Sequence, residues 1–303
     1  MAVMGCEPGI GRVVLSGLKV ARLPKPPPSA VSHDTTALRF CDVTGAPRAF
    51  NSATASENKI HDTAVARTYG FEGGLVPGVT VFAYMTEPVV ATWGRRWFEG
   101  GTMSARFAKP FYEGELVVAT ADGDERRLEL SASGESGEPR ATGTAGFSDT
   151  TAPDPSDYPT APLPADRPPA VADNLQPGTI LGSVEAGFRA AKAGAFLDEL
   201  SDDLPVYRGD DAIAHPGWLI LTANLILSSN VKLGPWIHVS SDITNFAPVT
   251  DGQRVTTRGR VAGRFDRKGH EFVELDLLWT VDDRPVMHAS HTAIYKVRKI
   301  SDG

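Results

Sequence analysis

A short polar loop and a glycine-rich segment hold the residues of this sequence best suited to chemistry. The loop runs from Ser56 to His61 and contains Asn58, and the second segment runs from Gly73 to Gly78 and leads into an apolar stretch. An imidazole has an ordinary pKa of about 6.5, so His61 can accept or return a proton near neutral pH. Together, the two segments place a titratable histidine in a polar loop shortly before a predicted buried helix.

A purely structural interpretation of the same residues stays open. A histidine in a polar loop could simply help to cap the helix that follows, with Asp62 or Thr63 at its N-cap. The glycines could serve only the tight turn before the apolar stretch, because glycine adopts backbone conformations that other residues avoid. Neither interpretation excludes a catalytic role.

Two apolar stretches with almost no charge are expected to form buried central helices. The first runs from Val79 to Trp93 after Pro77-Gly78, and the second runs from Trp218 to Leu227 after Pro216-Gly217. A proline and a glycine before each stretch suit a helix start. Pro88 inside the first stretch predicts a kink or a break.

Runs of alternating polar and apolar residues follow each predicted helix and are expected to form strands. They lie at 103–107, 116–121, 127–131 and 140–147, and again at 236–243, 254–261, 271–281 and 285–297. A further short strand is expected at 48–54, and hairpin turns at Asp122-Gly123 and Asp282-Asp283. One helix followed by four antiparallel strands, twice, predicts an α+β fold with a helix on each curved sheet.

A faint internal repeat supports this division into two halves. The segment Pro110–Val117 resembles Pro248–Val255, which lies 138 positions later, and Pro77-Gly78 recurs 139 positions later as Pro216-Gly217. Two landmarks in the same order at nearly the same offset indicate a tandem repeat. Coincidence in a chain with 30 Gly and 23 Pro is the alternative.

A proline-rich segment separates the two halves of the repeat. Seven prolines lie between Asp149 and Val171, where large aliphatic residues are scarce, so a semi-rigid, solvated linker is expected there. The predicted organisation is an N-terminal tail or arm at 1–35, a first domain at 36–148, the linker at 149–171 and a second domain at 172–299.

The polar loop and the glycine-rich segment resemble the signature of the MaoC-like hydratases and dehydratases of the hotdog fold. In that family, the motif Asp-x-Asn-Pro-Leu-His precedes the glycine that opens a central helix, and His61 stands seventeen residues before Gly78 here. A later strand of the family resembles Arg106–Glu115. The resemblance covers about residues 40–147 and, more weakly, 175–298. It implies a tandem, double hotdog fold, and two copies could associate as a homodimer.

The resemblance also implies an activity, the reversible addition of water to a 2-enoyl thioester of CoA or of an acyl carrier protein, as in fatty acid or polyketide metabolism. His61 would hold and deprotonate the water, and Asn58 would orient it. The amide of Gly78, at the positive end of the helix, would donate to the thioester carbonyl as enolate charge develops. No cofactor is implied beyond the substrate's own pantetheine. The substrate would lie against the helix start, at Gly74, Val76, Pro77 and Val79.

The sequence departs from the family motif at two positions. The family's catalytic Asp corresponds to Ser56 and its Pro to Lys59. A serine cannot act as a carboxylate base at pH 7, so Glu57 or Asp62 would have to supply the missing carboxylate. Two further functions therefore stay open: a hotdog thioesterase that uses Glu57, and a non-catalytic acyl-thioester-binding protein or structural partner.

The second half lacks the motif and is expected to complete the core and shape an acyl tunnel. A structural role is favoured for His215, at the predicted helix entrance, over a place in a second cleft. His238 could border a site between the halves, although a position away from the site is favoured. His270 lies in a predicted hairpin and is expected to be solvated. His288 and His291 are three residues apart on one strand, so they face opposite sides and cannot easily share a metal ion.

Composition and charge exclude several other functions. Thirty Lys plus Arg against 37 Asp plus Glu give a net charge of −7, which argues against a nucleic-acid binder. Two cysteines and scattered histidines predict no metal site. No apolar run approaches the ~20 residues needed to span a bilayer, and the N-terminus lacks the pattern of a signal peptide. A cytoplasmic protein that does not enter a membrane is expected.

Overall fold

The computed structural model describes residues 11–12 and 46–299 of the 303-residue chain. The tail predicted at 1–35 therefore lies outside the described residues, except for Gly11–Arg12, which forms the short strand β1. Both cysteines, Cys6 and Cys41, also lie outside them. The architecture below concerns the described part of the chain.

The described strands form a single mixed sheet. Its order is β1-β6-β8-β9-β10-β7-β2-β5-β4-β3, and all neighbours are antiparallel except β1 and β6. The first half of the chain supplies β2 to β5, and the second half supplies β6 to β10. The halves meet where β2 pairs with β7, from Thr102 opposite Thr244 to Arg106 opposite Ser240. The strands beyond β1 are Gly101–Phe107 (β2), Val118–Gly123 (β3), Arg127–Ser133 (β4), Pro139–Phe147 (β5), Ile180–Gly187 (β6), Ile237–Asn245 (β7), Arg254–Arg267 (β8), His270–Val281 (β9) and Arg284–Lys296 (β10).

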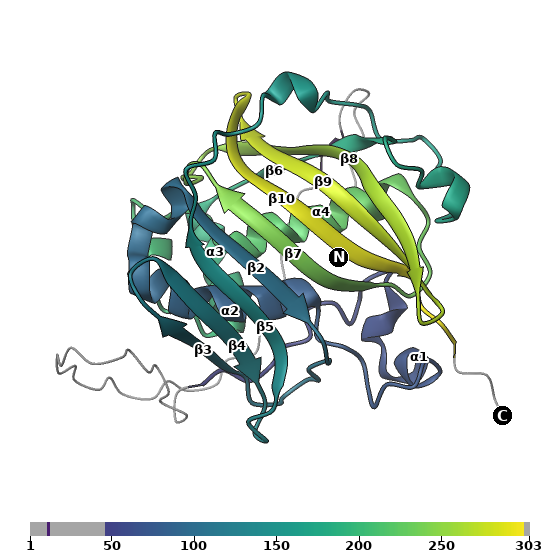
Figure 1. Ribbon diagram of the computed structural model, residues 1–303, viewed down its shortest axis with the longest axis horizontal. Coiled ribbons are helices and arrows are strands. Elements are labelled where there is room, and N and C mark those ends of the chain that lie inside the picture. Colours follow the sequence, from purple (N-terminus) through teal and green to yellow (C-terminus); the bar gives the residue numbers. More distant parts are fainter. Residues whose placement is uncertain (1–10, 13–45, 300–303) are drawn as a thin grey trace.

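Two central helices lie against one face of this sheet, side by side (Figure 1). They are α2 (Gly78–Trp93) and α4 (Pro216–Asn230), and both are apolar on nearly every side, as expected for helices enclosed by a sheet and by each other. The predicted tandem hotdog, with one helix on a curved antiparallel sheet in each half and the two sheets joined, is confirmed. Shorter helices, α1 (Thr63–Arg67) and α3 (Ala190–Leu200), lie outside the central pair.

The backbone repeats itself between the halves. Just before α2, the amide of Val76 donates to the carbonyl of Phe111, and just before α4 the amide of Ala214 donates to that of Val249, both at 2.8 Å. The turns that carry Gly114 and Gly252 also match, with φ of 80° and 85°. The tandem repeat predicted from the two sequence landmarks is thereby confirmed.

Several predicted elements differ from the structure. Pro88 does not break α2, which is continuous through it. The strand expected at 48–54 is wrong, because Arg48 forms only an isolated bridge and a turn follows. The first hairpin turn lies two residues later than expected, because the side chain of Asp124 accepts the amides of Arg126 and Arg127. The turn at Asp282-Asp283 is confirmed, with φ of 48° and 58°.

Two elements of the second half were missing from the sequence analysis. One is strand β6, which contains Gly182. A Cβ at position 182 would come within 2.6 Å of the Pro162 carbonyl oxygen, so only glycine allows the segment around Pro162 to lie this close to the strand. Helix α3 is the other element. The expected linker at 149–171 also packs more closely than predicted, because Tyr158 is buried and its hydroxyl donates to Asp276 at 2.9 Å. The predicted domain boundaries themselves stay predictions.

Candidate active site

The polar loop folds into two short capped turns. Asn58 caps a single 3-10 turn, Lys59–His61, by accepting the amide of Ile60. Asp62 then caps α1 by accepting the amide of Val65 at 3.0 Å, so the predicted N-cap at this position is confirmed. The carboxylate of Asp62 is therefore occupied by the helix start, and His61 stands between the two caps.

The ring of His61 donates at one nitrogen and accepts at the other. Its Nδ1 lies 2.7 Å from the carbonyl oxygen of Leu75, which can only accept, so Nδ1 carries the hydrogen and Nε2 the lone pair. Burial lowers the pKa of His61 below its ordinary value, and the bond to Leu75 only partly opposes this. His61 is thus a neutral imidazole at pH 7, and its basic Nε2 lies 3.2 Å from Nδ2 of Asn58.

Asn58 ties this histidine to the second half of the chain. Its Oδ1 accepts the amide of Trp236 at 3.1 Å, and its Nδ2 donates to the Trp236 carbonyl at 2.9 Å and to His61 Nε2 at 3.2 Å. The backbone N–H of Trp236 can only donate and its carbonyl can only accept, so the first must face Oδ1 of Asn58 and the second Nδ2. These bonds therefore fix the orientation of the Asn58 side-chain amide. The predicted positioning residue therefore also bridges the two halves.

The start of α2 presents an uncapped amide to the same region. Pro77 occupies the N-cap position and offers no side-chain acceptor, and within the described residues no group accepts the Gly78 amide. A helix N-terminus of this kind favours developing negative charge. A Cβ at position 78 would lie 2.9 Å from the His238 carbonyl oxygen and 3.0 Å from His238 Nδ1, so glycine is required by the close approach of β7.

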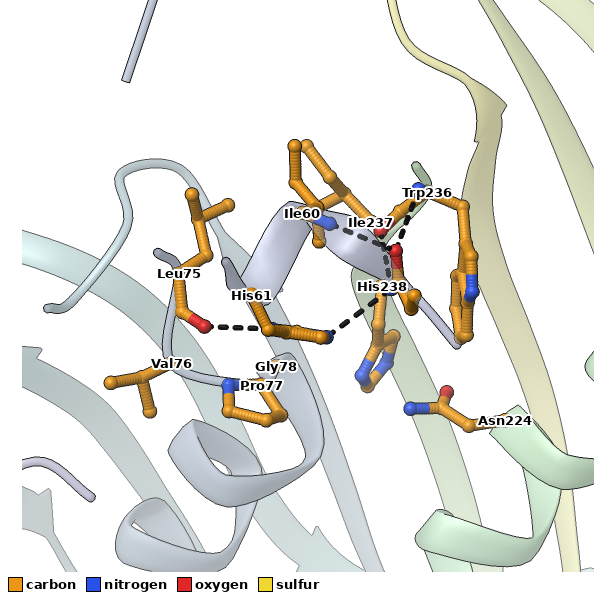
Figure 2. A pocket seen from close by; sticks show the side chains of 11 residues that line it. Ile60, His61, Leu75, Val76, Pro77, Gly78, Asn224, Trp236, Ile237 and His238 are labelled. Atoms are coloured by element: carbon orange, nitrogen blue, oxygen red, sulfur yellow. Dashed lines mark hydrogen bonds between the residues drawn. The ribbon is translucent and has the colours of Figure 1, made fainter. Parts of the chain in front are cut away.

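These groups line one pocket between the two halves (Figure 2). The first half contributes Asn58, Ile60, His61 and residues 75–78, and the second half contributes Asn224 and residues 236–238. The cavity volume is about 20 Å³, which is room for one water molecule and too little for an acyl chain. His238 does border the site, whereas the predicted acyl tunnel is not open here.

The structure separates the other residues singled out in the sequence. Val76 and Pro77 line the pocket, but Gly74 and Val79 do not. Ser56 donates to the Asn58 carbonyl at 3.2 Å and does not reach the pocket. The carboxylate of Glu57 is 78% exposed and faces Arg167 at 3.0 Å, away from His61. No carboxylate lines the described pocket, so the position left by the family's Asp is not refilled by a neighbour.

Gly74 has a structural role that its spacing did not reveal, and it gives a stability prediction. A Cβ at position 74 would come within 2.1 Å of the His61 carbonyl oxygen, so Gly74→Ala must displace the His61 loop. We expect a loss of about 1–3 kcal/mol in the free energy of unfolding. Thermal or urea denaturation measures this loss. Gly73→Ala is the matched control, because its Cβ would meet only ordinary contacts at 3.6 and 3.7 Å. Equal stability of the two variants would contradict the assignment.

Comparison with solved structures places this arrangement in a known fold. A protein from Chloroflexus aurantiacus described as a MaoC domain dehydratase matches 85% of this chain and 91% of its own, at 13% identity and a TM-score of 0.58. A double hotdog protein from Mycobacterium tuberculosis matches 83% of this chain and 99% of its own, at 14% identity and a TM-score of 0.54. A MaoC-like dehydratase matches 80% of this chain and 91% of its own, at 13% identity and a TM-score of 0.52.

This chain is a double hotdog protein. The resemblance to MaoC-like proteins that the sequence motif predicted is confirmed at the level of the fold. Neither a protein-family model nor a curated protein matches the sequence. At this level of identity the comparison carries no information about substrate or catalytic residues, which depend on the site itself.

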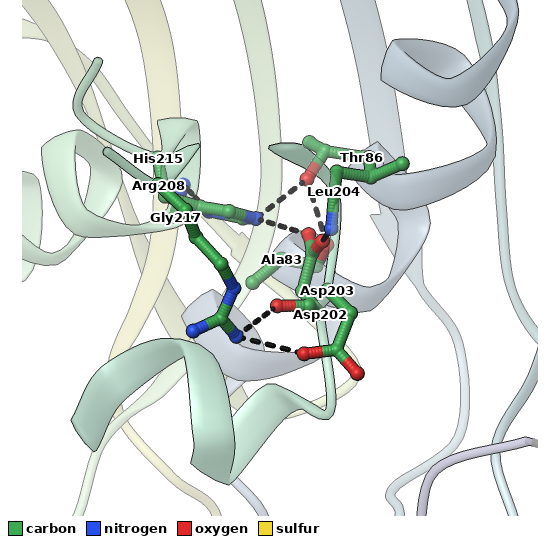
Figure 3. A network of polar contacts seen from close by, with 8 residues as sticks. All are labelled: Ala83, Thr86, Asp202, Asp203, Leu204, Arg208, His215 and Gly217. Carbon is green, nitrogen blue, oxygen red and sulfur yellow. Dashed lines mark hydrogen bonds and ion pairs between the residues drawn. The ribbon is translucent and has the colours of Figure 1, made fainter. Parts of the chain in front are cut away.

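The second hotdog half closes the position that corresponds to the Gly78 amide. Gly217 matches Gly78 in the Pro-Gly repeat of the sequence and is the first residue of α4 with a backbone N–H, which donates to Nδ1 of His215 at 2.9 Å. Nε2 of the same ring lies 3.3 Å from the Asp202 carboxylate and 3.4 Å from the Thr86 hydroxyl (Figure 3). His215 is 3% exposed. The structural role favoured for His215 is confirmed. Of the two central helices, only α2 therefore begins with an amide that no described residue caps.

The three other histidines of the second half, His270, His288 and His291, lie on strands and differ in burial. His291 is buried beneath the sheet, whereas His288 faces the other side and lies 2.7 Å from Asp276. His270 is partly exposed at the start of β9, where its Nδ1 accepts the amide of Arg298 at 3.1 Å. In residues 11–12 and 46–299, no three His, Cys, Asp or Glu side chains gather as metal ligands would. No helix in these ranges is both long and apolar enough to cross a bilayer.

Two polar residues at the site were not recognised from the sequence. Asn51 is 6% exposed, and its side-chain amide donates to the His61 carbonyl at 3.0 Å, so it holds the loop from outside the motif. Asn224 reaches the pocket from α4, and its buried Oδ1 has no partner among the described residues. A signal for Asn224 existed, because it is the one amide within the apolar stretch Trp218–Leu227.

Proposed function

We propose that this protein catalyses the reversible addition of water to a 2-enoyl thioester carried by CoA or by an acyl carrier protein. The observation that supports this proposal is the pocket in which a neutral His61 and the uncapped amide of Gly78 face a space of one water molecule. A base for water and a donor for an oxyanion are the two groups that hydration of an enoyl thioester needs.

The proposed reaction uses His61 twice. Water donates to Nε2 of His61, and its oxygen bonds to C3 of the enoyl group while the proton moves to the ring. The electron pair of the C2–C3 double bond shifts towards the thioester oxygen, where the Gly78 amide donates to the enolate. The His61 imidazolium then returns its proton to C2, so atoms and charge balance. Dehydration follows the same steps in reverse.

Asn58 supports this reaction through its position. A water molecule at His61 Nε2 replaces the 3.2 Å bond from Asn58 Nδ2. The Asn58 side chain stays fixed meanwhile by its bonds to the backbone of Trp236 and of Ile60. Hydrolysis of the thioester is less well supported, because the exposed Glu57, paired with Arg167, has no access to the pocket.

The experiment that tests this function is a hydration assay with crotonyl-CoA. The small cavity favours a short acyl group, since a long chain requires more of the lining side chains to move. We expect loss of the enoyl absorbance and formation of 3-hydroxybutyryl-CoA, with no release of free thiol. Free thiol would indicate a thioesterase instead. No turnover of enoyl- or 3-hydroxyacyl-CoA, under conditions where a known hydratase is active, would contradict the proposal.

A further inference from the structure

A second imidazole reaches the pocket from the opposite half of the chain. His238, on β7, is 4% exposed, and its Nε2 lies 2.9 Å from the hydroxyl oxygen of Ser241. Its Nδ1 is buried and has no hydrogen-bond partner among the described residues. This nitrogen stands beside the start of α2, 3.0 Å from where a Cβ of residue 78 would be. Figure 2 shows the ring of His238 between the start of α2 at Gly78 and the side chain of Asn224.

A short hydrogen-bonded chain holds this ring from behind. The Ser241 hydroxyl lies 2.9 Å from His238 Nε2 and 2.9 Å from Nδ1 of His291, and the two imidazoles stack with ring centroids 4.1 Å apart. Burial lowers the pKa of both histidines, for His291 to about 3, so both rings are neutral at pH 7. Each neutral ring therefore carries one hydrogen and one lone pair.

The unpartnered nitrogens of His238 and His291 indicate which nitrogen of each ring carries the hydrogen. His291 Nε2 is also buried without a described partner, and it lies in the closed core, where His291 is 0% exposed. An orphaned N–H donor is rarer in protein interiors than an orphaned acceptor. The favoured arrangement thus leaves a lone pair on His291 Nε2 in the core. His291 Nδ1 then donates to Ser241, Ser241 donates to His238 Nε2, and the N–H of His238 Nδ1 faces the pocket.

We propose that the Nδ1–H of His238 is a second oxyanion donor, which together with the Gly78 amide binds the thioester oxygen of the substrate. The proposal rests on the proposed function, because it assigns a donor to the enolate formed there. A buried N–H without a partner costs free energy, and a substrate oxygen at this place removes that cost. The donor is neutral, so it stabilises the enolate without giving up its proton, as preorganised donors in water-excluded sites do.

Three substitutions of His238 separate this role from packing. His238→Phe keeps the ring shape and removes both nitrogens, and His238→Gln places an amide near Ser241 while leaving no donor beside Gly78. His238→Asn keeps an amide at the position of Nδ1. We expect kcat for crotonyl-CoA to fall about 10²–10³-fold in the Phe and Gln variants, with KM changed less than about 3-fold, and Asn to restore kcat to within about 10-fold of wild type.

A spectroscopic readout tests the same contact without turnover. The carbonyl stretching band of bound butyryl-CoA, a saturated thioester, is expected at a lower frequency in wild type and His238→Asn than in the Phe and Gln variants, because donors polarise the bond. Unchanged kcat in the Phe and Gln variants, an Asn variant as impaired as Phe, or a band insensitive to residue 238 would each overturn the inference. A sensitive band in a wild-type protein without hydratase activity would overturn the proposed hydration alone and leave the donor role of His238 intact.

Discussion

His61→Asn is expected to abolish most hydratase activity, with kcat lowered about 10²–10⁴-fold, the usual contribution of a general acid and base. Asparagine is the most informative replacement because its side-chain amide can still donate to the Leu75 carbonyl, as Nδ1 does now at 2.7 Å. The loop is then preserved, while the basic Nε2 is lost. KM for crotonyl-CoA should change little, since the substitution removes a proton-transfer group rather than a binding contact.

The pH dependence of the wild-type protein's proposed activity provides an independent measurement of the role of His61. Only the neutral form of His61 can take a proton from water, and burial lowers the pKa of this histidine below its ordinary value of about 6.5. We expect kcat/KM to decrease as the pH falls, with the midpoint of the decrease below 6.5. His270→Asn, at the start of β9, is the control and should leave the profile unchanged. A His61→Asn variant that keeps more than about a tenth of the activity would rule His61 out as the base.

The sequence predicted the architecture well because the features that define it are local. Each central helix was marked by an apolar stretch after a Pro-Gly pair, and both stretches form the helices that the sheet encloses. The turn at Asp282-Asp283 was equally direct, since two consecutive positive φ angles suit a two-residue hairpin. Strand β6 escaped recognition because Gly182 fits a close backbone contact instead of continuing an apolar face.

The candidate site was only half predictable, because half of it comes from the other end of the chain. The polar loop gave His61 and Asn58, and the helix start gave Gly78, all within about twenty residues of one another. Asn224 and His238 belong to α4 and β7 and reach the pocket only because β2 pairs with β7. No local spacing in the sequence encodes that pairing, so the role of His238 could not be decided before the halves were placed together.

The two halves of the double hotdog differ in what occupies the amide at the helix start. In the second half, His215 accepts the Gly217 amide and is itself held by Asp202 and Thr86, so the position is filled from within. In the first half, Pro77 takes the N-cap position that His215 takes in the second and offers no side-chain acceptor, so the Gly78 amide stays available. Of the two equivalent helix starts, only that of α2 thus has a backbone amide free to bind a ligand, which favours a single active site in the described part of the chain.

Gly78→Ala is therefore expected to be nearly as damaging as the loss of His61, although it removes no reacting group. The added Cβ would lie 2.9 Å from the His238 carbonyl oxygen, 3.0 Å from His238 Nδ1 and 3.1 Å from His238 Cβ, so α2 and β7 must move apart. The methyl group would also stand between the two proposed donors to the thioester oxygen. We expect kcat/KM to fall about 10²–10³-fold, as when an oxyanion donor is lost.

The cost in stability and a matched control show whether this effect is local. Overpacking of this kind lowers the free energy of unfolding by about 1–3 kcal/mol, which leaves most of the variant folded at room temperature. Gly194→Ala in α3 is the control, because its Cβ would meet nothing within 4 Å, and it should retain both stability and activity. Circular dichroism and crotonyl-CoA kinetics on the same samples compare folding with turnover. Full activity of Gly78→Ala would mean that the substrate oxygen does not bind between α2 and β7, because a methyl group there leaves it no room.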